Sequence, residues 1–349
     1  MKTITINTRE IGPGHPVFII AELSGNHNQD FEQAAQLIHE AHKAGADAVK
    51  LQTYTPDTIT VPCDSDYFRV GNGMLWEGKT LHTLYAEAYT PWEWQPELKR
   101  IASDLGIPLF STPFDPTSVD FLEKMGVPAY KIASFELVDL PLIHKVAMTG
   151  KPIILSTGMA TLAEIDDAIR CIRKTGNEKI SLLKCTSAYP APPEEMNLRT
   201  IPHLAGMFGL PVGLSDHTLG IAVPIAAVTL GACIIEKHLT LSRSIPGPDS
   251  AFSLEPAEFR MLVNSVRETE KALGKISYEP TDHEKASRIF RRSLFVVEEV
   301  NEGDIFTDRN IRSIRPGHGI PPNNLNIVIG KKARKSVKKG TPFQWDMIW

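Results

Sequence analysis

Eight short apolar runs, each ending in polar residues, constrain the fold of this 349-residue chain more than any other feature. Their lengths and their β-branched and aliphatic composition are typical of strands that are buried on both faces. The runs occupy residues 17–23, 47–53, 107–113, 128–134, 152–158, 180–186, 212–216 and 232–238. The sequence therefore predicts an α/β fold built on a parallel sheet.

Amphipathic helical patterns fill the gaps between these runs. In residues 31–45, apolar side chains recur on one helical face, and Gly45 supplies a C-terminal stop. In residues 161–176, Thr161 and Glu164 form a capping-box pattern. Eight such units within about 270 residues match the size of a (β/α)₈ TIM barrel. A doubly wound open sheet is the alternative, but no G-x-G-x-x-G motif follows the first strand, so we predict the barrel.

The same patterns divide the chain into parts. More than 50 residues separate the second run from the third, and their Trp, Tyr and turn residues predict a functional loop over the C-terminal face of the barrel. We predict a catalytic barrel in residues 1–275 and a linker in residues 276–290, where periodicity is lost. Short strand-like runs, Gly turns and Pro residues predict a small β-rich domain in residues 291–349.

The composition excludes several classes of protein. With 42% hydrophobic residues and a net charge of -4, the chain favours neither a nucleic-acid nor a membrane partner. The N-terminus lacks an apolar signal segment and the four cysteines lack CxxC spacing, so we expect a cytoplasmic location. Residues 288–349 hold 12 Lys and Arg against 6 Asp and Glu, and this net charge of +6 leaves -10 for residues 1–287. We expect the basic segment to contact another subunit or an anionic ligand.

Polar side chains gather at the C-terminal ends of the eight runs. In a barrel all of these ends meet at one mouth, which is where active sites of this fold lie. The residues are Glu22, Asn26, His27, Lys50, Gln52, Ser111, Thr112, Lys131, Ser134, Glu136, Ser156, Thr157, Lys184, Thr186, Tyr189, Ser215, Asp216, His217, Glu236 and His238.

His217 and His238 end adjacent strands, so their imidazoles are expected to share a divalent metal. Glu22 or Asp249 would complete a nitrogen and oxygen site suited to Mn²⁺, Zn²⁺, Co²⁺ or Fe²⁺. The structural alternative is that one imidazole only hydrogen-bonds a neighbour. Beside this metal site, Asp216 would either orient His217 or cap the following helix.

Three lysines, Lys50, Lys131 and Lys184, lie in otherwise apolar strands, where a buried ammonium needs an anion. With nearby hydroxyl groups they would form a cradle for phosphate or carboxylate. Those hydroxyls belong to Thr112, Ser134, Ser156 and Ser215. A Schiff-base lysine and simple ion pairs with Glu22 or Glu136 are the alternatives.

Seven motifs carry a resemblance to a known family. In order along the chain, they are IAELSGNHNQD, VKLQT, STPFD, YKIAS, ILSTGMA, GLSDHT and EKHLT…PGPD. Over nearly its whole length the chain resembles the sialic acid synthases, which join phosphoenolpyruvate (PEP) to an amino sugar. The C-terminal RRSLFVVEEVNEGDIF…NIRSIRPGHG is similar to the antifreeze-like SAF domain of that family, which has a β-clip fold.

The resemblance implies a role for each candidate residue. The metal ligands would be His217 and His238. The metal would be Mn²⁺, with Mg²⁺ or Co²⁺ as alternatives. Glu22 would lie near the reacting atoms. PEP contacts would come from Lys50, Thr112, Lys131, Ser134, Ser156 and Ser215. Sugar contacts would come from Gln52, Glu136, Tyr189, Asp249 and, across a domain-swapped homodimer, Arg315 of the RPG motif.

The resemblance also implies a transferase reaction. PEP C3 would attack the open-chain aldehyde, polarised by the metal, and water added with help from Glu22 would lead to C–O cleavage and phosphate release. LQTYTPDTIT and LWEGKTLHTLYAEAYTPWEW are more similar to members that act on 2,4-diacetamido-2,4,6-trideoxy-L-altrose than to N-acetylneuraminate synthases. Ser187, where the latter commonly have Asn, agrees with this assignment.

Three other functions are alternatives to a synthase that acts on the L-altro diacetamido sugar. The first is a legionaminate-type or N-acetylneuraminate synthase of the same family. The second is a metal-independent aldolase that forms an imine on Lys131 or Lys184. The third is a sugar-binding protein without catalytic activity.

Overall fold

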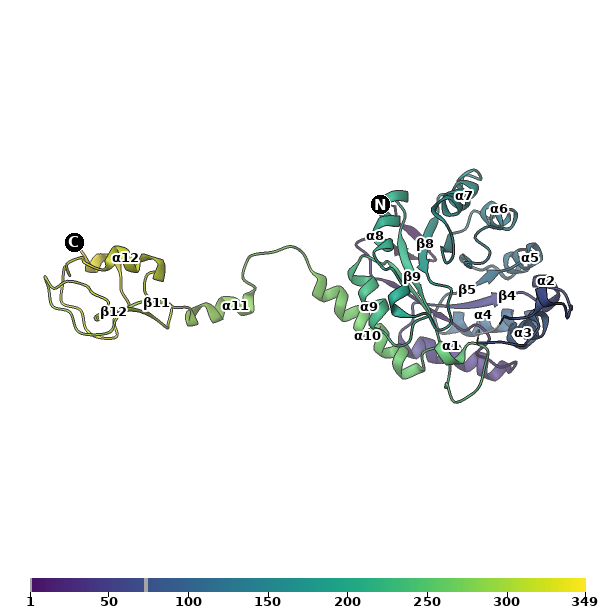
Figure 1. Ribbon diagram of the computed structural model, residues 1–349, viewed down its shortest axis with the longest axis horizontal. Helices are drawn as coiled ribbons and strands as arrows, with labels where there is room; N and C mark the ends of the chain where they lie inside the picture. Colours follow the sequence, from purple (N-terminus) through teal and green to yellow (C-terminus); the bar gives the residue numbers. More distant parts are fainter. Residues whose placement is uncertain (1, 72–74) are drawn as a thin grey trace. The chain divides into compact units, whose positions relative to one another are not determined.

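The computed structural model describes residues 2–71 and 75–349, and the chain divides after Gly274 into two compact units. Within the described part of the first unit, eight parallel strands close into a barrel in the order β10-β3-β4-β5-β6-β7-β8-β9. Figure 1 labels β4, β5, β8 and β9 of this barrel. The eight strands are β3 Phe18–Glu22, β4 Ala48–Thr53, β5 Leu109–Pro113, β6 Tyr130–Ile132, β7 Ile153–Ser156, β8 Ile180–Cys185, β9 Val212–Asp216 and β10 Ile234–His238. The predicted barrel and its eight runs are confirmed.

The pairing of β10 with β3 closes the barrel, with His238 opposite Glu22. On the other side of β10, Lys237 lies opposite Asp216 of β9. Every residue of β10 is buried, as a strand between the barrel interior and a helix layer requires. Because all neighbours are parallel, the eight C-terminal ends deliver their side chains to one mouth.

Helices surround the barrel (Figure 1), and their ends follow the capping signals of the sequence. Asp30 accepts a hydrogen bond from the Gln33 N–H at the start of α1, and Gly45 ends that helix at φ 89°. Thr161 and Glu164 form the predicted capping box of α7. The helices are α1 Phe31–Ala44, α4 Gln95–Asp104, α5 Pro116–Met125, α6 Leu140–Met148, α7 Leu162–Arg173, α8 Thr200–Phe208, α9 Ala222–Thr229 and α10 Pro256–Leu273.

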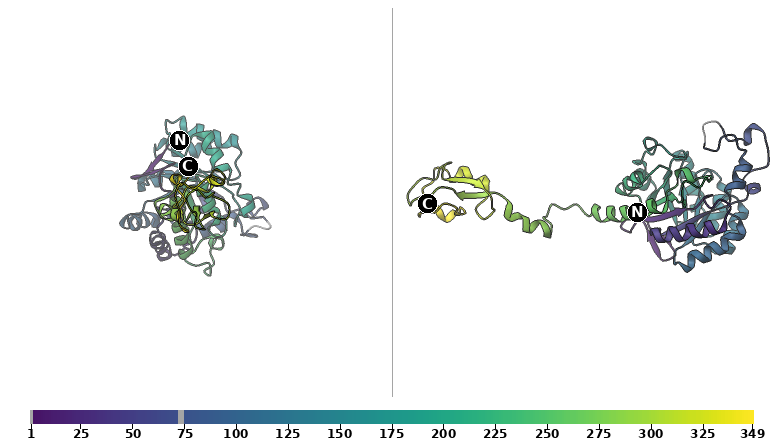
Figure 2. Two further views of the ribbon diagram at one scale, coloured as in Figure 1. Left: turned by 90° about the vertical axis from the view of Figure 1, so that its left-hand side faces the viewer. Right: turned by 90° about the horizontal axis from the view of Figure 1, so that it is seen from below.

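Two features of the first unit go beyond the repeating pattern. The long segment between β4 and β5 contains the short helices α2 Pro56–Ile59 and α3 Leu81–Ala88. An N-terminal hairpin, β1 Ile4–Ile6 and β2 Arg9–Ile11, precedes the barrel (Figure 2, purple) and was not predicted. Its isoleucines join the barrel core, and Arg9 pairs with Asp47 just before β4. The hairpin therefore lies at the amino end of the barrel, opposite the mouth.

The second unit has its own core around the antiparallel strands β11 Ser293–Val296 and β12 Ile311–Ile314. Phe306 and Phe343 pack edge to face in this core, with ring centroids 5.1 Å apart. Residues 276–290, predicted as linker, contain the short helix α11 Asp282–Ser287, which begins with a capping box. The short helix α12 Leu325–Val328 follows β12, and residues 329–349 after it form isolated antiparallel bridges, such as Val300 with Val337, and a 3-10 turn at Trp345–Met347. Across the described residues, no helix combines the length and apolar character that a membrane span requires.

Candidate active site

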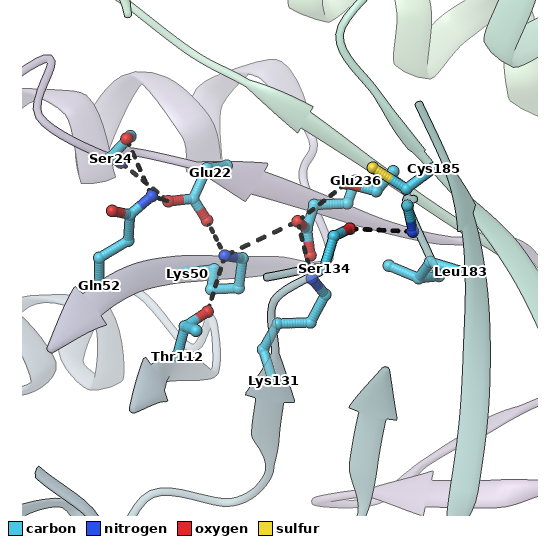
Figure 3. Close-up of polar contacts among 12 residues, drawn as sticks. Glu22, Ser24, Lys50, Gln52, Thr112, Lys131, Ser134, Leu183, Cys185 and Glu236 are labelled. Carbon is cyan, nitrogen blue, oxygen red and sulfur yellow. Dashed lines mark hydrogen bonds and ion pairs between the residues drawn. The ribbon is translucent and has the colours of Figure 1, made fainter. Parts of the chain in front are cut away.

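Four buried charged side chains from four strands meet in the barrel mouth (Figure 3). Lys50 pairs with Glu22, and its Nζ lies 3.7 Å from Glu236 Oε1. Lys131 Nζ lies 3.5 Å from the same oxygen. All four side chains are at most 4% exposed. Two carboxylates thus balance two ammonium groups in a place where unpaired charges would be costly.

The two carboxyl groups of this cluster differ in the direction of their pKa shifts. Burial raises the pKa of Glu22, and the opposing effect of Lys50 only partly offsets it. Burial also acts on Glu236, but Lys131 and Lys50 together hold the pKa of that carboxyl below its ordinary value. Of the two carboxylates, Glu22 is therefore the one that accepts a proton more readily.

Hydroxyl groups surround the lysines. Lys50 Nζ donates to Thr112 Oγ1 at 3.1 Å, and Ser215 Oγ donates to Glu236 Oε1 at 3.3 Å. Ser134 Oγ accepts the backbone N–H of Gly158 at 3.1 Å (Figure 3). Ser156 Oγ is buried with no hydrogen-bond partner among the described residues. The Ser156 hydroxyl is therefore available to bond a ligand or a water molecule.

The two histidines lie side by side at the ends of β9 and β10, with ring centroids 5.3 Å apart. His217 Nδ1 lies 3.0 Å from the carbonyl oxygen of Thr186, which fixes the donor on Nδ1 and leaves Nε2 free to bind. His238 Nδ1 is buried with no partner among the described residues. Burial, together with nearby positive groups, holds the pKa of His238 well below its usual range, so its imidazole is neutral.

The neutral His238 imidazole fits a divalent cation, because a metal ligand must be neutral and a buried nitrogen needs a partner. Burial lowers the pKa of His217, but Cys185 and the Thr186 carbonyl together raise it above its ordinary value, so a cation would compete with a proton for that ring. Among the described residues, no third His, Cys, Asp or Glu joins the two imidazoles to make a three-ligand group. Glu22 instead pairs with Lys50, and Asp249 is bonded to Ser24. In this arrangement neither carboxylate forms a three-ligand group with the two histidines, and the carboxylate ligand stays a prediction.

Aromatic rings cover the histidines from the outside. Tyr189 stacks against His217 at 4.6 Å between ring centroids, and Phe252 packs against His238 at 5.0 Å. Trp76, from the long segment after β4, contacts Tyr189 and donates its indole N–H to the Pro248 carbonyl at 2.7 Å. The prediction that this segment overhangs the mouth is confirmed, because three loops meet over the site.

A second polar cluster joins the expected sugar-binding residues. Gln52 Nε2 donates to Glu22 Oε1 at 3.2 Å and to Ser24 Oγ at 3.0 Å (Figure 3). Ser24 in turn donates its hydroxyl hydrogen to Asp249. Glu136 follows β6 and has a buried Oε2 without a partner among the described residues.

Comparison with known proteins shows which family the chain belongs to. The NeuB family model matches residues 37–278, and the SAF domain model matches residues 291–348. The chain belongs to the NeuB family. The pseudaminic acid synthase of Helicobacter pylori is 45% identical over 336 residues, covering 95% of this chain and 98% of that protein. The pseudaminic acid synthase of Campylobacter jejuni is 43% identical, covering 93% and 94%.

Solved structures of NeuB-like proteins share the fold. N-acetylneuraminic acid synthetase from Leptospira borgpetersenii, solved in complex with citrate, matches with a TM-score of 0.73 at 35% identity. The match covers 82% of this chain and 95% of that one. The resemblance to the sialic acid synthase family inferred from the motifs is confirmed.

Several candidates of the barrel unit lie outside the charged cluster of the mouth. Lys184 Nζ donates to the carbonyl of Cys185 at 2.7 Å, on the strand face opposite the Cys185 thiol, and so does not join the other lysines. Asn26 and His27 bind neighbouring loops, with His27 Nε2 3.1 Å from Thr90 Oγ1. Arg315 is exposed in the second unit, directly after β12.

Asp216, which the sequence left unassigned, is a structural residue. Its Oδ2 lies 2.5 Å from Lys237 Nζ, and both side chains are fully buried. Its Oδ1 accepts the Thr218 N–H at 3.1 Å. Asp216 therefore fixes the turn after β9, and alternation along the strand turns its side chain and that of His217 to opposite faces.

Sequence reasoning named Glu236 only as a strand-end residue and missed two further residues of the site. Glu236 is central to the charged network, and its alternation with His238 in IIEKH was a usable signal. The first of the two missed residues is Cys185, whose Sγ lies 3.9 Å from His217 Nδ1. Alternation along β8 was again a usable signal, because Cys185 and Leu183 lie on the same face of that strand. Ser24 gave no such signal, because it lies in a turn beyond the end of β3.

Proposed function

We propose that this chain condenses PEP with 2,4-diacetamido-2,4,6-trideoxy-L-altrose and water to give pseudaminic acid and phosphate. The observation that carries the proposal is the meeting of two lysines, two carboxylates and two imidazoles in one buried barrel mouth. The two relatives that are 43–45% identical, both pseudaminic acid synthases, support the choice of sugar. The reaction class would be that of a C–C bond-forming transferase.

The phosphate and carboxylate of PEP would bind to the two buried lysines. Lys50 and Lys131 now share Glu236, so an arriving trianion would compete with that carboxylate for both ammonium groups. Thr112, Ser134, Ser156 and Ser215 line the same region and offer hydroxyl donors to the phosphate oxygens. Their hydrogen bonds would hold PEP before bond formation and hold phosphate after C–O cleavage.

His217 and His238 would hold a divalent cation, with Mn²⁺ the first choice and Mg²⁺ or Co²⁺ the alternatives. When bound, such a cation supplies Lewis-acid polarisation of the sugar aldehyde. Thr186 would keep His217 in the required tautomer through its carbonyl. Glu22, whose burial raises its pKa, would take the proton from the water that adds to C2 of the former PEP.

The sugar would bind against Gln52, Glu136, Tyr189 and Asp249. Gln52 and Asp249 offer polar atoms, and the Tyr189 ring offers an apolar face for the deoxy carbon or an acetamido methyl. We further propose that Arg315 of a partner subunit reaches this sugar in a domain-swapped homodimer in the cytoplasm. The net charge of +6 on residues 288–349 against -10 on the rest of the chain favours such an exchange.

The direct test is phosphate release from PEP by metal-loaded protein across a panel of amino sugars, with mass detection of the nine-carbon product. We expect release with the L-altro diacetamido sugar and loss of activity after chelation. Release with N-acetylmannosamine or with the legionaminate-type sugar alone would contradict the choice of substrate. Borohydride trapping with pyruvate, without phosphate release, would instead support a lysine aldolase.

Two lysine variants give this test a matched control. Lys131→Met removes a charge-assisted contact in the mouth and should lower kcat/KM for PEP by about 10–100-fold. Lys184→Met removes a lysine that binds its own strand end and should keep the wild-type value within about twofold. Equal losses in the two variants would contradict the proposed PEP cradle.

A further inference from the structure

Ser24 has a backbone conformation that its residue type does not favour. Its φ is 47°, in the left-handed region that glycine adopts freely and that residues with a Cβ avoid. The neighbouring Gly25 is not at positive φ; a Cβ there would come within 3.0 Å of the Ala88 backbone. The glycine of this turn thus serves close packing, while the strained position carries a serine that is only 2% exposed. Strained backbone conformations of this kind are kept mainly at functional positions, where the surrounding contacts hold them.

The Ser24 side chain joins two segments of the mouth. Its hydroxyl donates to Asp249 in the loop after β10. It also accepts from Gln52 Nε2 on β4 at 3.0 Å (Figure 3). Its backbone N–H donates to Glu22 Oε1 at 3.1 Å. A hydroxyl has a single hydrogen, so the bond to Asp249 leaves its oxygen to accept from Gln52.

This chain of hydrogen bonds fixes the orientation of the Gln52 amide. The amide nitrogen, Nε2, donates to Ser24 and, at 3.2 Å, to Glu22. Both amide hydrogens are therefore used, and the carbonyl oxygen Oε1 is the amide atom left for a ligand. Without the hydroxyl, the amide would keep only its bond to Glu22 and would be held less firmly in this orientation.

We propose that Ser24 is a positioning residue that sets the sugar-binding surface of the mouth. It holds Gln52 with its carbonyl oxygen toward the substrate and holds the Asp249 carboxylate in place, so both accept hydrogen bonds from hydroxyl or acetamido N–H groups. This inference rests on the proposed function, because it assigns a role toward the amino sugar and none toward PEP.

Two substitutions separate this role from a structural one. Ser24→Gly removes the hydroxyl and also relieves the backbone strain, so its melting temperature should equal or exceed that of the wild type. Ser24→Ala removes the hydroxyl but keeps the Cβ, so it should melt below the Gly variant. In both variants the KM for the sugar should rise about tenfold, as for loss of one positioned hydrogen bond, while the KM for PEP stays within about twofold.

The outcomes that overturn the inference are distinct. A sugar KM within twofold of wild type in Ser24→Gly would show that the hydroxyl does not position the sugar ligands. Equal rises in both KM values together with a lower melting temperature in Ser24→Gly would indicate a purely structural residue. If wild-type protein releases no phosphate with any sugar, the proposed function itself fails, and the assignment of Ser24 falls with it.

Discussion

Glu136 shows how a single side chain in the mouth can couple stability to pH. Burial raises the pKa of this carboxyl from an ordinary 4.5 to about 7. Between these two values the folded state keeps a proton that the unfolded chain has already lost. Stability contributed by the neutral carboxyl is therefore present below pH 4.5 and is lost as pH rises to about 7. A protonated Glu136 can also donate a hydrogen bond to an acetamido carbonyl.

Glu136→Gln should remove this pH dependence, because the amide stays neutral at every pH. We expect the melting temperature of the variant, relative to wild type, to be higher at pH 8 than at pH 4.5 by about 2–6 °C. Thermal denaturation of both proteins at the two pH values measures the difference. A relative melting temperature that is the same at both pH values would contradict the elevated pKa.

At the scale of strands, the Asp216–Lys237 pair joins β9 to β10 directly behind the two histidines. Lys237→Met would leave Asp216 buried without its cation and should cost about 3–5 kcal/mol of stability. In the double variant Asp216→Asn with Lys237→Met, the loss should be smaller than the sum of the single losses. Urea denaturation of the four proteins gives the coupling energy. Additive losses would show that the pair contributes no coupling.

The sequence carried most of the information about these elements. Apolar runs and capping residues are local signals, so all eight barrel strands and helices such as α7 could be predicted. The N-terminal hairpin was not predicted, because its strands have only three residues each and are stabilised by packing against the barrel core. Helix α11 carries a capping box at Thr281 and Glu284, but it is too short for a periodic pattern.

The partners of site residues were harder to predict, because they depend on register and on loops. Asp216 could be assigned only once its position opposite Lys237 was known. Lys184 was grouped with the site lysines because composition alone does not tell which face of a strand a residue occupies. Ser24 depends on a turn conformation and on Asp249, 225 residues away, and no local pattern encodes that contact.

At the scale of the whole molecule, the residues proposed to act on the substrates are distributed over the two compact units. The barrel unit carries the lysines, carboxylates and histidines, whereas Arg315 lies in the second unit with a separate hydrophobic core. In a domain-swapped homodimer, each complete site would take its barrel from one chain and its arginine from the other. A site of this kind can be rebuilt from two chains that are each inactive.

Co-expression of Arg315→Ala and His238→Ala chains tests this arrangement. Each variant alone should have little activity, but half of the randomly assembled dimers would be mixed, and each would contain one intact site. We therefore expect recovery to about a quarter of wild-type phosphate release. The matched control pairs His238→Ala with Glu22→Gln, two barrel defects that mixing leaves without an intact site. Light scattering verifies the dimer, and absence of recovery in the Arg315 pair would contradict the action of Arg315 across subunits.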